Sequence, residues 1–485
     1  MTGFPQIPDF IGLNRPVGID CTFEDLAIEG HLPAEIEGSF FRAVPDPKFA
    51  PLFDDDNALS GDGMISRIRF RDGKADFAIR YVDTARHLAE MAAGRALFGR
   101  YRNPFTDDPG VRGVDRTVAN TTPVWHAGTL LMTKEDGRPY RIDPDTLETI
   151  GRYDFGGALK SETMTAHVRV DATTGEMLAF GYEADGLCSR TIAYFVVGPD
   201  GRLTRETWFD APYCSMMHDF AITEHYALFP VFPTTTDLDR LKAGGEHWTH
   251  DNDLESWIGI LPRDGTAEDV RWIKGPRGVS VYHIMNAHEG ADGRIHLDMC
   301  QSKTNIFPFI QRASGFSVPP WESAGGLMRW SFAPDGSGEI DIRPIGPPGD
   351  MPRIADRDQG LPYSEGWYLT VDPQQGMPVM GGVVGAMFNA LLRIEPETGR
   401  IDAMAAGGHA LSEPVHIPSA TPGHAGWLAM VVDKPLDDDS FEHAVWVVDA
   451  GNVAAGPVAK IAIPHRLRPQ VHGWWVSAAA LDAAA

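Results

Sequence analysis

The sequence predicts an all-β protein, a β-propeller closed by pairing between the two ends of the chain. Three observations predict it: a recurring turn, short apolar runs of strand length, and a composition rich in turn-forming residues. The 485 residues include 51 Gly and 37 Pro, which favour many tight turns over long helices. Helical periodicity is confined to residues 87–97 and, more weakly, 238–244, in insertions that we expect to cap one face of the propeller.

A turn built from Pro, Asp and Gly recurs along the chain. Pro presets φ, Asp can bond to its own backbone and Gly permits a positive φ, so each copy predicts a hairpin tip between two strands. The spacing is regular at first and then wider, as expected for a repeated blade with insertions. The copies lie at residues 141–146, 170–175, 197–201, 261–265, 332–336 and 394–399.

Runs of aromatic, branched and other apolar residues predict strands at 129–133, 179–182, 227–232 and 444–448. No linker divides the chain, so we expect one domain over residues 1–485. In such a fold the innermost strand of each blade lines a shared axis, and residues distant in sequence can meet there.

The glycine-rich segment 381–385 lacks the Lys and the Ser or Thr of a phosphate-binding loop. A tight crossing between strands explains it better than a nucleotide site.

Charge and cysteine usage exclude several classes of protein. A formal net charge of −25 argues against a nucleic-acid surface, which needs clustered Lys and Arg. The four cysteines show no disulfide or zinc-site spacing. The first 17 residues lack the pattern of a signal peptide, and no apolar run is long enough to cross a bilayer. We therefore expect a cytoplasmic protein without stable membrane insertion.

Four histidines in apolar or strand-like surroundings are candidate metal ligands. An all-imidazole set suits Fe(II), among other borderline divalent metals, and leaves two positions of an octahedral ion for dioxygen or water. Metal-bound imidazoles usually donate their second N–H to a carboxylate. The candidate ligands are His167, His218, His283 and His472, and the candidate carboxylates are Glu135, Asp350 and Glu413.

Most of the 17 histidines must have ordinary roles. On the run that contains His283, we expect His288 not to bind metal, and Asn286 and Glu289 to shape the local backbone. Four others stand among charged residues, Gly or Pro and are expected at the surface: His247, His250, His424 and His443.

Over almost its whole length the chain resembles the carotenoid cleavage oxygenase family. The resemblance rests on several separate motifs that occur in the family's order. They are Gly61-Asp62-Gly63-Met64, Glu135-Asp136-Gly137-Arg138-Pro139-Tyr140, Thr165-Ala166-His167, Met217-His218-Asp219-Phe220, the run from His283 to Glu289, Glu413-Pro414, and Arg468-Pro469 with His472-Gly473.

This resemblance implies a seven-bladed β-propeller with an axial Fe(II) held by His167, His218, His283 and His472. It also implies that Glu135 and Glu413 support the imidazoles. The family usually places the third acid, a Glu, before a Phe-Pro-Arg-like motif, where this chain has Asp350. We expect this shorter acid to need a bridging water, or not to reach its imidazole.

Within the family the chain is most similar to the bacterial lignostilbene dioxygenases, in which a Tyr and a Lys hold the substrate's phenolic hydroxyl. The resemblance implies that Tyr101 and Lys134 do so here and favour the phenolate. The activity it implies is cleavage of the central C=C bond of a 4-hydroxystilbene with O2 into two aromatic aldehydes. It also implies a homodimer.

Two other functions stay open: cleavage of a carotenoid or apocarotenoid by the same iron centre, and a metal-free propeller that acts as a binding module. Lys134 could equally be a solvated surface lysine, and strict strand alternation would point Lys134 and Glu135 to opposite faces. Leu59 stands where many relatives have an aromatic residue. The leucine in place of an aromatic ring would widen the substrate tunnel that the resemblance implies. Phe307 and Phe309 are either gate or core residues.

Overall fold

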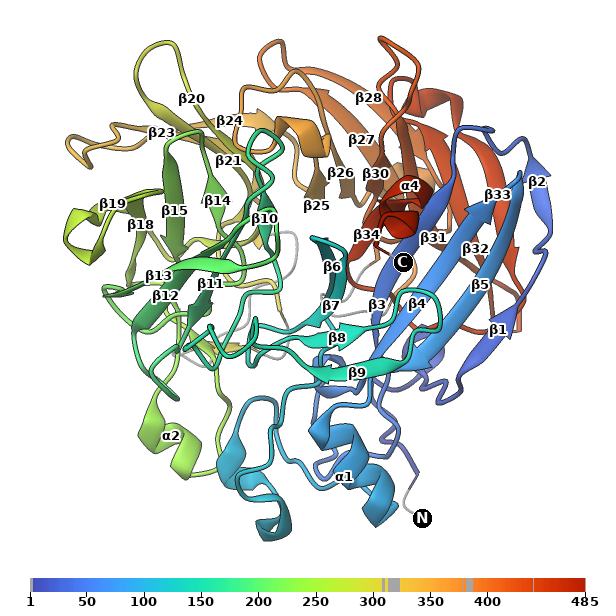
Figure 1. Cartoon of the computed structure of the whole chain (residues 1–485), viewed down its shortest axis with the longest axis horizontal. Coiled ribbons are helices and arrows are strands. Elements are labelled where there is room, and N and C mark those ends of the chain that lie inside the picture. The colour runs from blue at the N-terminus through green and yellow to red at the C-terminus, as the bar shows by residue number, and fades with distance from the viewer. Residues whose placement is uncertain are drawn as a thin grey trace. The chain divides into compact units, whose positions relative to one another are not determined.

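The computed structural model describes residues 3–307, 310–312, 323–376, 378–380, 387–438 and 440–484. The chain forms two compact units. Unit 1 comprises Met1–Tyr153, Tyr368–Arg393 and Asp402–Ala485, and unit 2 comprises Asp154–Trp367 and Ile394–Ile401. Most of the regular structure is β-strand, as Figure 1 shows. The all-β prediction is therefore confirmed.

Unit 1 contains three antiparallel sheets, with strand orders β1-β5-β4-β3-β34, β2-β33-β32-β31-β29 with β30 also on β31, and β6-β7-β8-β9. Their strands are β1 (Cys21–Phe23), β2 (Ile28–Gly30), β3 (Gly38–Pro45), β4 (Gly63–Arg71), β5 (Lys74–Tyr81), β6 (Thr122–His126), β7 (Thr129–Thr133), β8 (Tyr140–Ile142), β9 (Thr149–Arg152), β29 (Ala410–Leu411), β30 (Val415–Ile417), β31 (Trp427–Pro435), β32 (Phe441–Asp449), β33 (Pro457–Ile463) and β34 (Gly473–Ser477).

Unit 2 contains three four-stranded antiparallel sheets, β10-β11-β12-β13, β14-β15-β18-β19 and β20-β21-β23-β24, and the small sheet β16-β17-β22. Their strands are β10 (Arg169–Val170), β11 (Met177–Tyr182), β12 (Thr191–Val197), β13 (Leu203–Asp210), β14 (Ala221–Ile222), β15 (Tyr226–Val231), β16 (Thr234–Thr235), β17 (Thr249–His250), β18 (Glu255–Pro262), β19 (Arg271–Arg277), β20 (Ser280–Glu289), β21 (Ile295–Ser302), β22 (Gln311–Arg312), β23 (Gly326–Phe332) and β24 (Asp341–Gly346).

A further four-stranded sheet, β25-β26-β27-β28, contains residues at which the units divide. Its strands are β25 (Asp350–Arg353), β26 (Gly366–Thr370), β27 (Ala390–Glu395) and β28 (Arg400–Ala405). With the three large sheets of each unit, the described part of the chain has seven sheets of blade size.

Each of the six predicted turns joins two neighbouring strands of one sheet: β8 to β9, β10 to β11, β12 to β13, β18 to β19, β23 to β24, and β27 to β28. The backbone closes these tips locally, for example from the Gly175 N–H to the Asp171 carbonyl at 2.8 Å. Turn chemistry read from the sequence therefore located the hairpins correctly.

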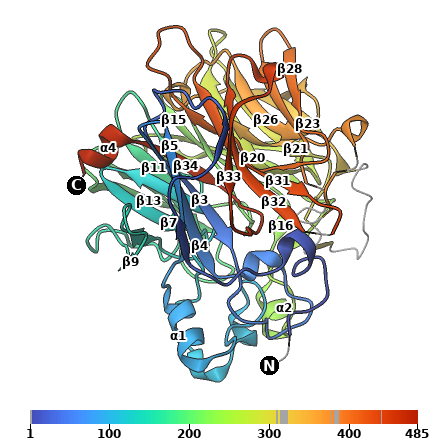
Figure 2. The same cartoon turned by 90° about the vertical axis from the view of Figure 1, so that its right-hand side faces the viewer.

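The C-terminal strand β34 pairs antiparallel with β3, so that Phe40 lies opposite Trp475. The N-terminal strand β2 likewise pairs with β33. Figures 1 and 2 show β34 beside β3. The predicted pairing of the two chain ends is therefore confirmed, and it takes place within unit 1.

The helices are short, and their ends follow from their caps. Helix α1 (Ala85–Ala93) starts two residues before the predicted segment because the Thr84 side chain accepts from the His87 N–H. It ends early because Gly94 adopts a left-handed φ of 65°. The other described helices are α2 (Leu238–Lys242), α4 (Ala478–Asp482) and the 3-10 turns η1 (Gly12–Asn14), η2 (Ala58–Ser60), η3 (Pro104–Thr106), η4 (Pro109–Val111), η5 (Ala267–Asp269), η6 (Asp356–Asp358), η7 (Pro373–Gln375) and η8 (Val453–Ala455).

Each unit has its own apolar core between the faces of its sheets. In unit 1 Phe40 and Val431 belong to one buried cluster, and in unit 2 Leu228 and Trp330 belong to another. Burial of one large apolar side chain contributes about 1.5–3 kcal/mol. The cores hold the sheets in place and so fix the strands and loops that carry the candidate site.

Candidate metal centre

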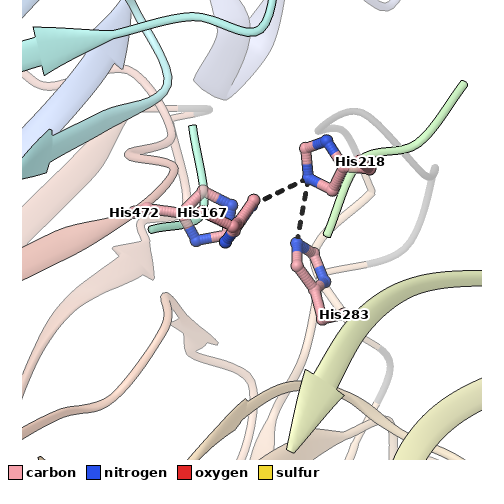
Figure 3. Close-up of side chains that lie close together, drawn as sticks. All are labelled: His167, His218, His283 and His472. Atoms are coloured by element: carbon pink, nitrogen blue, oxygen red, sulfur yellow. Dashed lines mark hydrogen bonds between the residues drawn. The ribbon is translucent and has the colours of Figure 1, made fainter. Parts of the chain in front are cut away.

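Three of the four predicted ligands lie together in unit 2. His167 precedes β10, His218 precedes β14, and His283 lies within β20. Nε2 of His218 lies 3.0 Å from Nε2 of His167 and 3.3 Å from Nε2 of His283. Figure 3 shows the two contacts that His218 makes with the other rings. The fold therefore brings these three imidazoles to one point.

The spacing of these nitrogens fits a metal ion. Two nitrogens that each lie about 2.1 Å from an ion are about 3.0 Å apart at a right angle and about 3.4 Å apart at a tetrahedral angle. The measured separations of 3.0 and 3.3 Å lie in this range. Among the described residues the group that could hold a metal consists of imidazoles alone. It therefore suits a borderline divalent metal.

Asp350 fixes the ring of His283. It is the first residue of β25, and its Oδ1 lies 2.8 Å from Nδ1 of His283. The carboxylate accepts, so Nδ1 carries the proton and Nε2 keeps its lone pair for a metal. The shorter acid reaches the imidazole directly. The expectation of a bridging water, or of no contact, was therefore wrong.

His472 has an equivalent carboxylate in unit 1. Its Nδ1 lies 3.0 Å from Oε1 of Glu413, and the Gly473 N–H donates to Oε2 at 2.8 Å. Both side chains are buried. Glu413 therefore holds the ring of His472 and selects the tautomer with an unprotonated Nε2. His472 is the fourth histidine drawn in Figure 3.

The sequence reading did not identify Arg42, whose buried guanidinium contacts the backbone around His472 and Glu413. Nη1 donates to the Glu413 carbonyl at 2.8 Å, and Nη2 donates to the Val471 carbonyl at 2.7 Å. The sequence feature that could have identified Arg42 is its position as a charged residue within the largely apolar strand β3. A charge at such a position needs polar partners inside the fold.

Lys134 and Glu135 are both buried, at 3% and 1% exposure. Strand β7 ends at Thr133, so strict alternation does not extend to this pair. The alternative of a solvated surface lysine was therefore wrong. Nζ of Lys134 lies 5.2 Å from the ring centroid of Tyr101, which is also buried.

The environment of this pair keeps both groups protonated. Burial raises the pKa of Tyr101, and the nearby Lys134 ammonium only partly opposes the rise. Burial also opposes the charge on Lys134, but attraction by Tyr101, Glu135 and Asp136 outweighs it, so the pKa of Lys134 is raised. Unit 1 therefore has a buried ammonium beside a neutral phenol.

Three histidines expected at the surface are buried. His247 Nε2 lies 3.1 Å from Glu183, His250 Nδ1 lies 3.1 Å from the Thr234 hydroxyl, and His443 Nδ1 lies 2.7 Å from Asp433. The expectation was wrong because polar neighbours in the sequence do not exclude a carboxylate or hydroxyl partner within the fold. His424 is partly exposed.

Asn286 and Glu289, which were expected to shape the local backbone, instead contact the backbone of distant segments. The Asn286 amide N–H2 donates to the Asp358 and Leu361 carbonyls at 3.1 and 2.9 Å. The Glu289 carboxylate accepts from the His225 N–H at 2.9 Å.

Of the two residues expected to belong to either a gate or the core, Phe307 has its ring centroid 4.1 Å from that of Tyr282. Leu59 is part of η2. Phe309 and the glycine-rich segment 381–385 lie outside the described residues.

In the part of the chain that the structure describes, no helix is long and apolar enough to cross a membrane.

Comparison with known proteins shows which proteins the chain is similar to. Residues 14–477 match the family model described as retinal pigment epithelial membrane protein. The chain is 39% identical over 494 residues to lignostilbene-alpha,beta-dioxygenase isozyme III of Sphingomonas paucimobilis, an alignment that covers 100% of both chains. It is 39% identical over 478 residues to isoeugenol monooxygenase of Pseudomonas putida, with 97% of this chain and 98% of that protein covered.

Among solved structures, the crystal structure of Pseudomonas brassicacearum lignostilbene dioxygenase matches with a TM-score of 0.93 at 40% identity and covers 98% of this chain and 100% of that one. The predicted fold class, an all-β seven-bladed propeller, is thereby confirmed. The chain belongs to the carotenoid cleavage oxygenase family, which includes the retinal pigment epithelial membrane protein.

Proposed function

We propose that this chain is a non-haem Fe(II) dioxygenase that cleaves the central C=C bond of a 4-hydroxystilbene and releases two aromatic aldehydes. The observation that carries the proposal is the group formed by His167, His218 and His283, with Nε2 separations of 3.0 and 3.3 Å. The 39% identity to a lignostilbene dioxygenase over the full chain supports the substrate class. Each alkene carbon gains one oxygen atom, so one O2 accounts for both aldehydes.

We propose that His472 supplies a fourth ligand, and that Glu135, Asp350 and Glu413 orient the ligating rings. The contacts from His283 to Asp350 and from His472 to Glu413 support this, because each ring then keeps a lone pair on Nε2. Bound iron would supply the binding and activation of O2. The residues of the chain fix the tautomers and hold the rings still.

Tyr101 and Lys134 are the proposed binding site for the substrate's phenolic oxygen. The Lys134 ammonium donates to that oxygen and favours its anionic form, while the Tyr101 hydroxyl donates a second hydrogen bond. Phenolate character raises electron density on the conjugated alkene, and its reaction with an electrophilic oxidant becomes easier. The burial of both side chains strengthens these contacts, because water does not compete for them.

Oxygen uptake with 4-hydroxystilbene and with its 4-methoxy analogue tests the proposal. We expect rapid uptake and two aldehydes from the phenol, and uptake at least about tenfold slower from the ether, which cannot form a phenolate. Equal rates on both substrates would rule out the phenolate role. Cleavage of an apocarotenal but of neither stilbene would instead assign carotenoid cleavage to the same centre.

A second candidate substrate is isoeugenol, favoured by the 39% identity to the isoeugenol monooxygenase of Pseudomonas putida. Isoeugenol shares a 4-hydroxyl group conjugated to the alkene but carries a methyl group in place of the second ring. The same phenol site would therefore hold both. Measurement of kcat/KM on isoeugenol and on 4-hydroxystilbene distinguishes the two substrate assignments. A higher value for isoeugenol would replace the stilbene assignment.

Several properties of the whole protein are also proposed. We expect both units to act as one catalytic domain over residues 1–485, the protein to be a homodimer, and its location to be cytoplasmic. The match of 98% of the chain to a single solved protein supports the expectation of one catalytic domain. The four cysteines, all present as thiols, support a reducing compartment. Light scattering after gel filtration tests the dimer, and a monomeric mass would contradict it.

A further inference from the structure

We infer that Asp219 and Arg169 are positioning residues for the metal centre. Together they join the three chain segments that carry His167, His218 and His283 at a fixed separation. This inference rests on the proposed function, because it concerns the same ligands. According to this inference, the buried ion pair of Arg169 and Asp219 sets the relative positions of the three imidazoles.

The Asp219 carboxylate connects residues beside two of the ligands. Asp219 directly follows His218, and its Oδ2 accepts from the N–H of Ile284, the residue after His283, at 2.9 Å. Its Oδ1 accepts from the Phe220 N–H at 2.8 Å. One carboxylate therefore ties the loop that carries His218 to strand β20.

Arg169 connects the third ligand to the same carboxylate. It lies two residues after His167, and its Nη2 donates to Oδ1 of Asp219 at 2.6 Å. Its Nε donates to the Phe220 carbonyl at 2.8 Å. The planar guanidinium thus contacts both the side chain and the backbone beside His218, which a lysine could not do with the same geometry.

A second path joins Arg169 to β20 two residues further along the strand than Ile284, at Asn286. Nη1 of Arg169 donates to Oε1 of Gln359 at 3.4 Å. Nε2 of Gln359 donates to Oδ1 of Asn286 at 3.1 Å, and Asn286 lies three residues beyond His283. Hydrogen bonds therefore reach β20 at two positions that follow its ligand, Ile284 and Asn286.

Because this ion pair is buried, loss of either partner should disturb the backbone beside the ligands. The side chains of Arg169 and Asp219 are 12% and 3% exposed. Loss of one partner leaves the other charge desolvated and unpaired, so the local backbone must shift to rehydrate it. Since Asp219 directly follows His218 and Arg169 lies two residues after His167, the shift moves the imidazoles. Outer partners of metal ligands typically change metal affinity by about 10- to 100-fold.

Unit 2 offers a matched control in the pair Asp298 and Arg329. Nε and Nη2 of Arg329 donate to the two oxygens of Asp298, each at 2.7 Å, and these side chains are 0% and 3% exposed. They lie on the neighbouring strands β21 and β23. Asp298→Asn therefore breaks a buried ion pair of the same kind, whose two residues make none of the hydrogen bonds to Ile284 and Phe220 that Asp219 makes beside the ligands.

The test measures iron release from the full-length iron-loaded protein into excess ferrozine, for the parent chain, Asp219→Asn, Arg169→Lys and Asp298→Asn. We expect iron release at least about tenfold faster from Asp219→Asn, and a smaller acceleration from Arg169→Lys, which keeps the charge but loses the planar fork. Asp298→Asn should release iron within about twofold of the parent rate. Hydrogen exchange at the Ile284 amide should become faster in Asp219→Asn.

Release from Asp219→Asn at the parent rate would overturn the positioning role. So would equally fast release from Asp298→Asn, because the effect would then be general loosening of unit 2. If Asp219→Asn does not fold, an unchanged rate in Arg169→Lys would overturn it. A parent protein that retains no iron would contradict the proposed metal centre itself, and both proposals would fall together.

Discussion

The Nδ1 atom of His283 lies 2.8 Å from Oδ1 of Asp350, 67 residues further along the chain. This hydrogen bond fixes the ring orientation and leaves Nε2 facing His218. The carboxylate also accepts from the Met351 N–H at 2.8 Å, so its own position is held by the backbone. The side chain of Asp350 is therefore long enough to hold the ring of His283 directly.

Replacement of Asp350 by Asn should weaken metal binding about 10- to 100-fold. The amide oxygen of Asn can still accept from Nδ1, but it lacks the charge that increases the basicity of the imidazole. Competition between the protein and a chelator of known iron affinity measures the change. Asp356→Asn is the control, since this residue lies six positions away in η6 and should leave the affinity unchanged. Unaltered affinity in Asp350→Asn would show that the contact has no effect on the metal.

Removal of the His283 imidazole should abolish stoichiometric iron. In His283→Ala one of the converging nitrogens is missing, and turnover should fall at least about a thousandfold because O2 activation depends on the metal. Metal analysis of the purified protein and an activity assay check both effects. His288→Ala is the control on the same strand, and it should retain iron. Full iron content in His283→Ala would contradict the assignment of this ligand.

Lys134→Met should lower kcat/KM on 4-hydroxystilbene by about 10- to 100-fold, the value of a charge-assisted hydrogen bond of about 1.5–3 kcal/mol. The smaller rate on the 4-methoxy analogue should hardly change, because that substrate offers no phenolate. Steady-state assays on both substrates check the difference between them.

Lys48 provides a matched control, since its Nζ lies 5.1 Å from the ring centroid of Tyr81 in a similar lysine–tyrosine contact. Lys48→Met should leave the ratio of the two rates unchanged. An equal loss on both substrates in Lys134→Met would assign Lys134 a structural role.

Stability should fall as the pH drops from about 6.5 to about 4, partly through His288. Burial lowers the pKa of this imidazole from 6.5 to about 4. Between these values the unfolded chain binds a proton that the folded chain does not, so the free energy of unfolding increases with pH across this window. His288 alone accounts for at most about 3 kcal/mol of the change.

Urea unfolding of the parent chain and of His288→Gln at several pH values checks this expectation. The difference in unfolding free energy between the two proteins should depend on pH within this window and level off above it. A difference that stays constant with pH would show that His288 does not titrate as expected.

Local elements of this fold could be predicted from short stretches of sequence. The turn at 170–175 and the strand at 129–133 each depend on a few neighbouring residues, and both occur where the sequence places them. The helix predicted at 87–97 was misplaced at both ends because the Thr84 cap and the Gly94 conformation outweigh apolar periodicity. Helix ends depend on single capping groups, and periodicity does not report them.

The histidines show how far the surroundings of an individual side chain can be predicted from its sequence neighbours. An apolar neighbourhood marked His283 as a candidate ligand, and its Nε2 lies 3.3 Å from that of His218. Charged neighbours misdirected the prediction for His443, whose Asp433 partner lies on the adjacent strand β31. Sequence neighbours describe one side of a residue only. The partner across a sheet is decided by strand register, and register is set by the packing of whole sheets.

The sequence by itself determined the blade repeat and the pairing of the chain ends, and its motifs predicted the residues that we propose carry the chemistry. Only the tertiary structure decided that Asp350 reaches His283, that Lys134 is buried beside Tyr101, and that Asp219 joins Ile284 to Arg169. The physical reason is one of range. Turn and strand preferences arise from bonded neighbours, whereas buried polar contacts form between segments that only packing of the cores brings within hydrogen-bond distance.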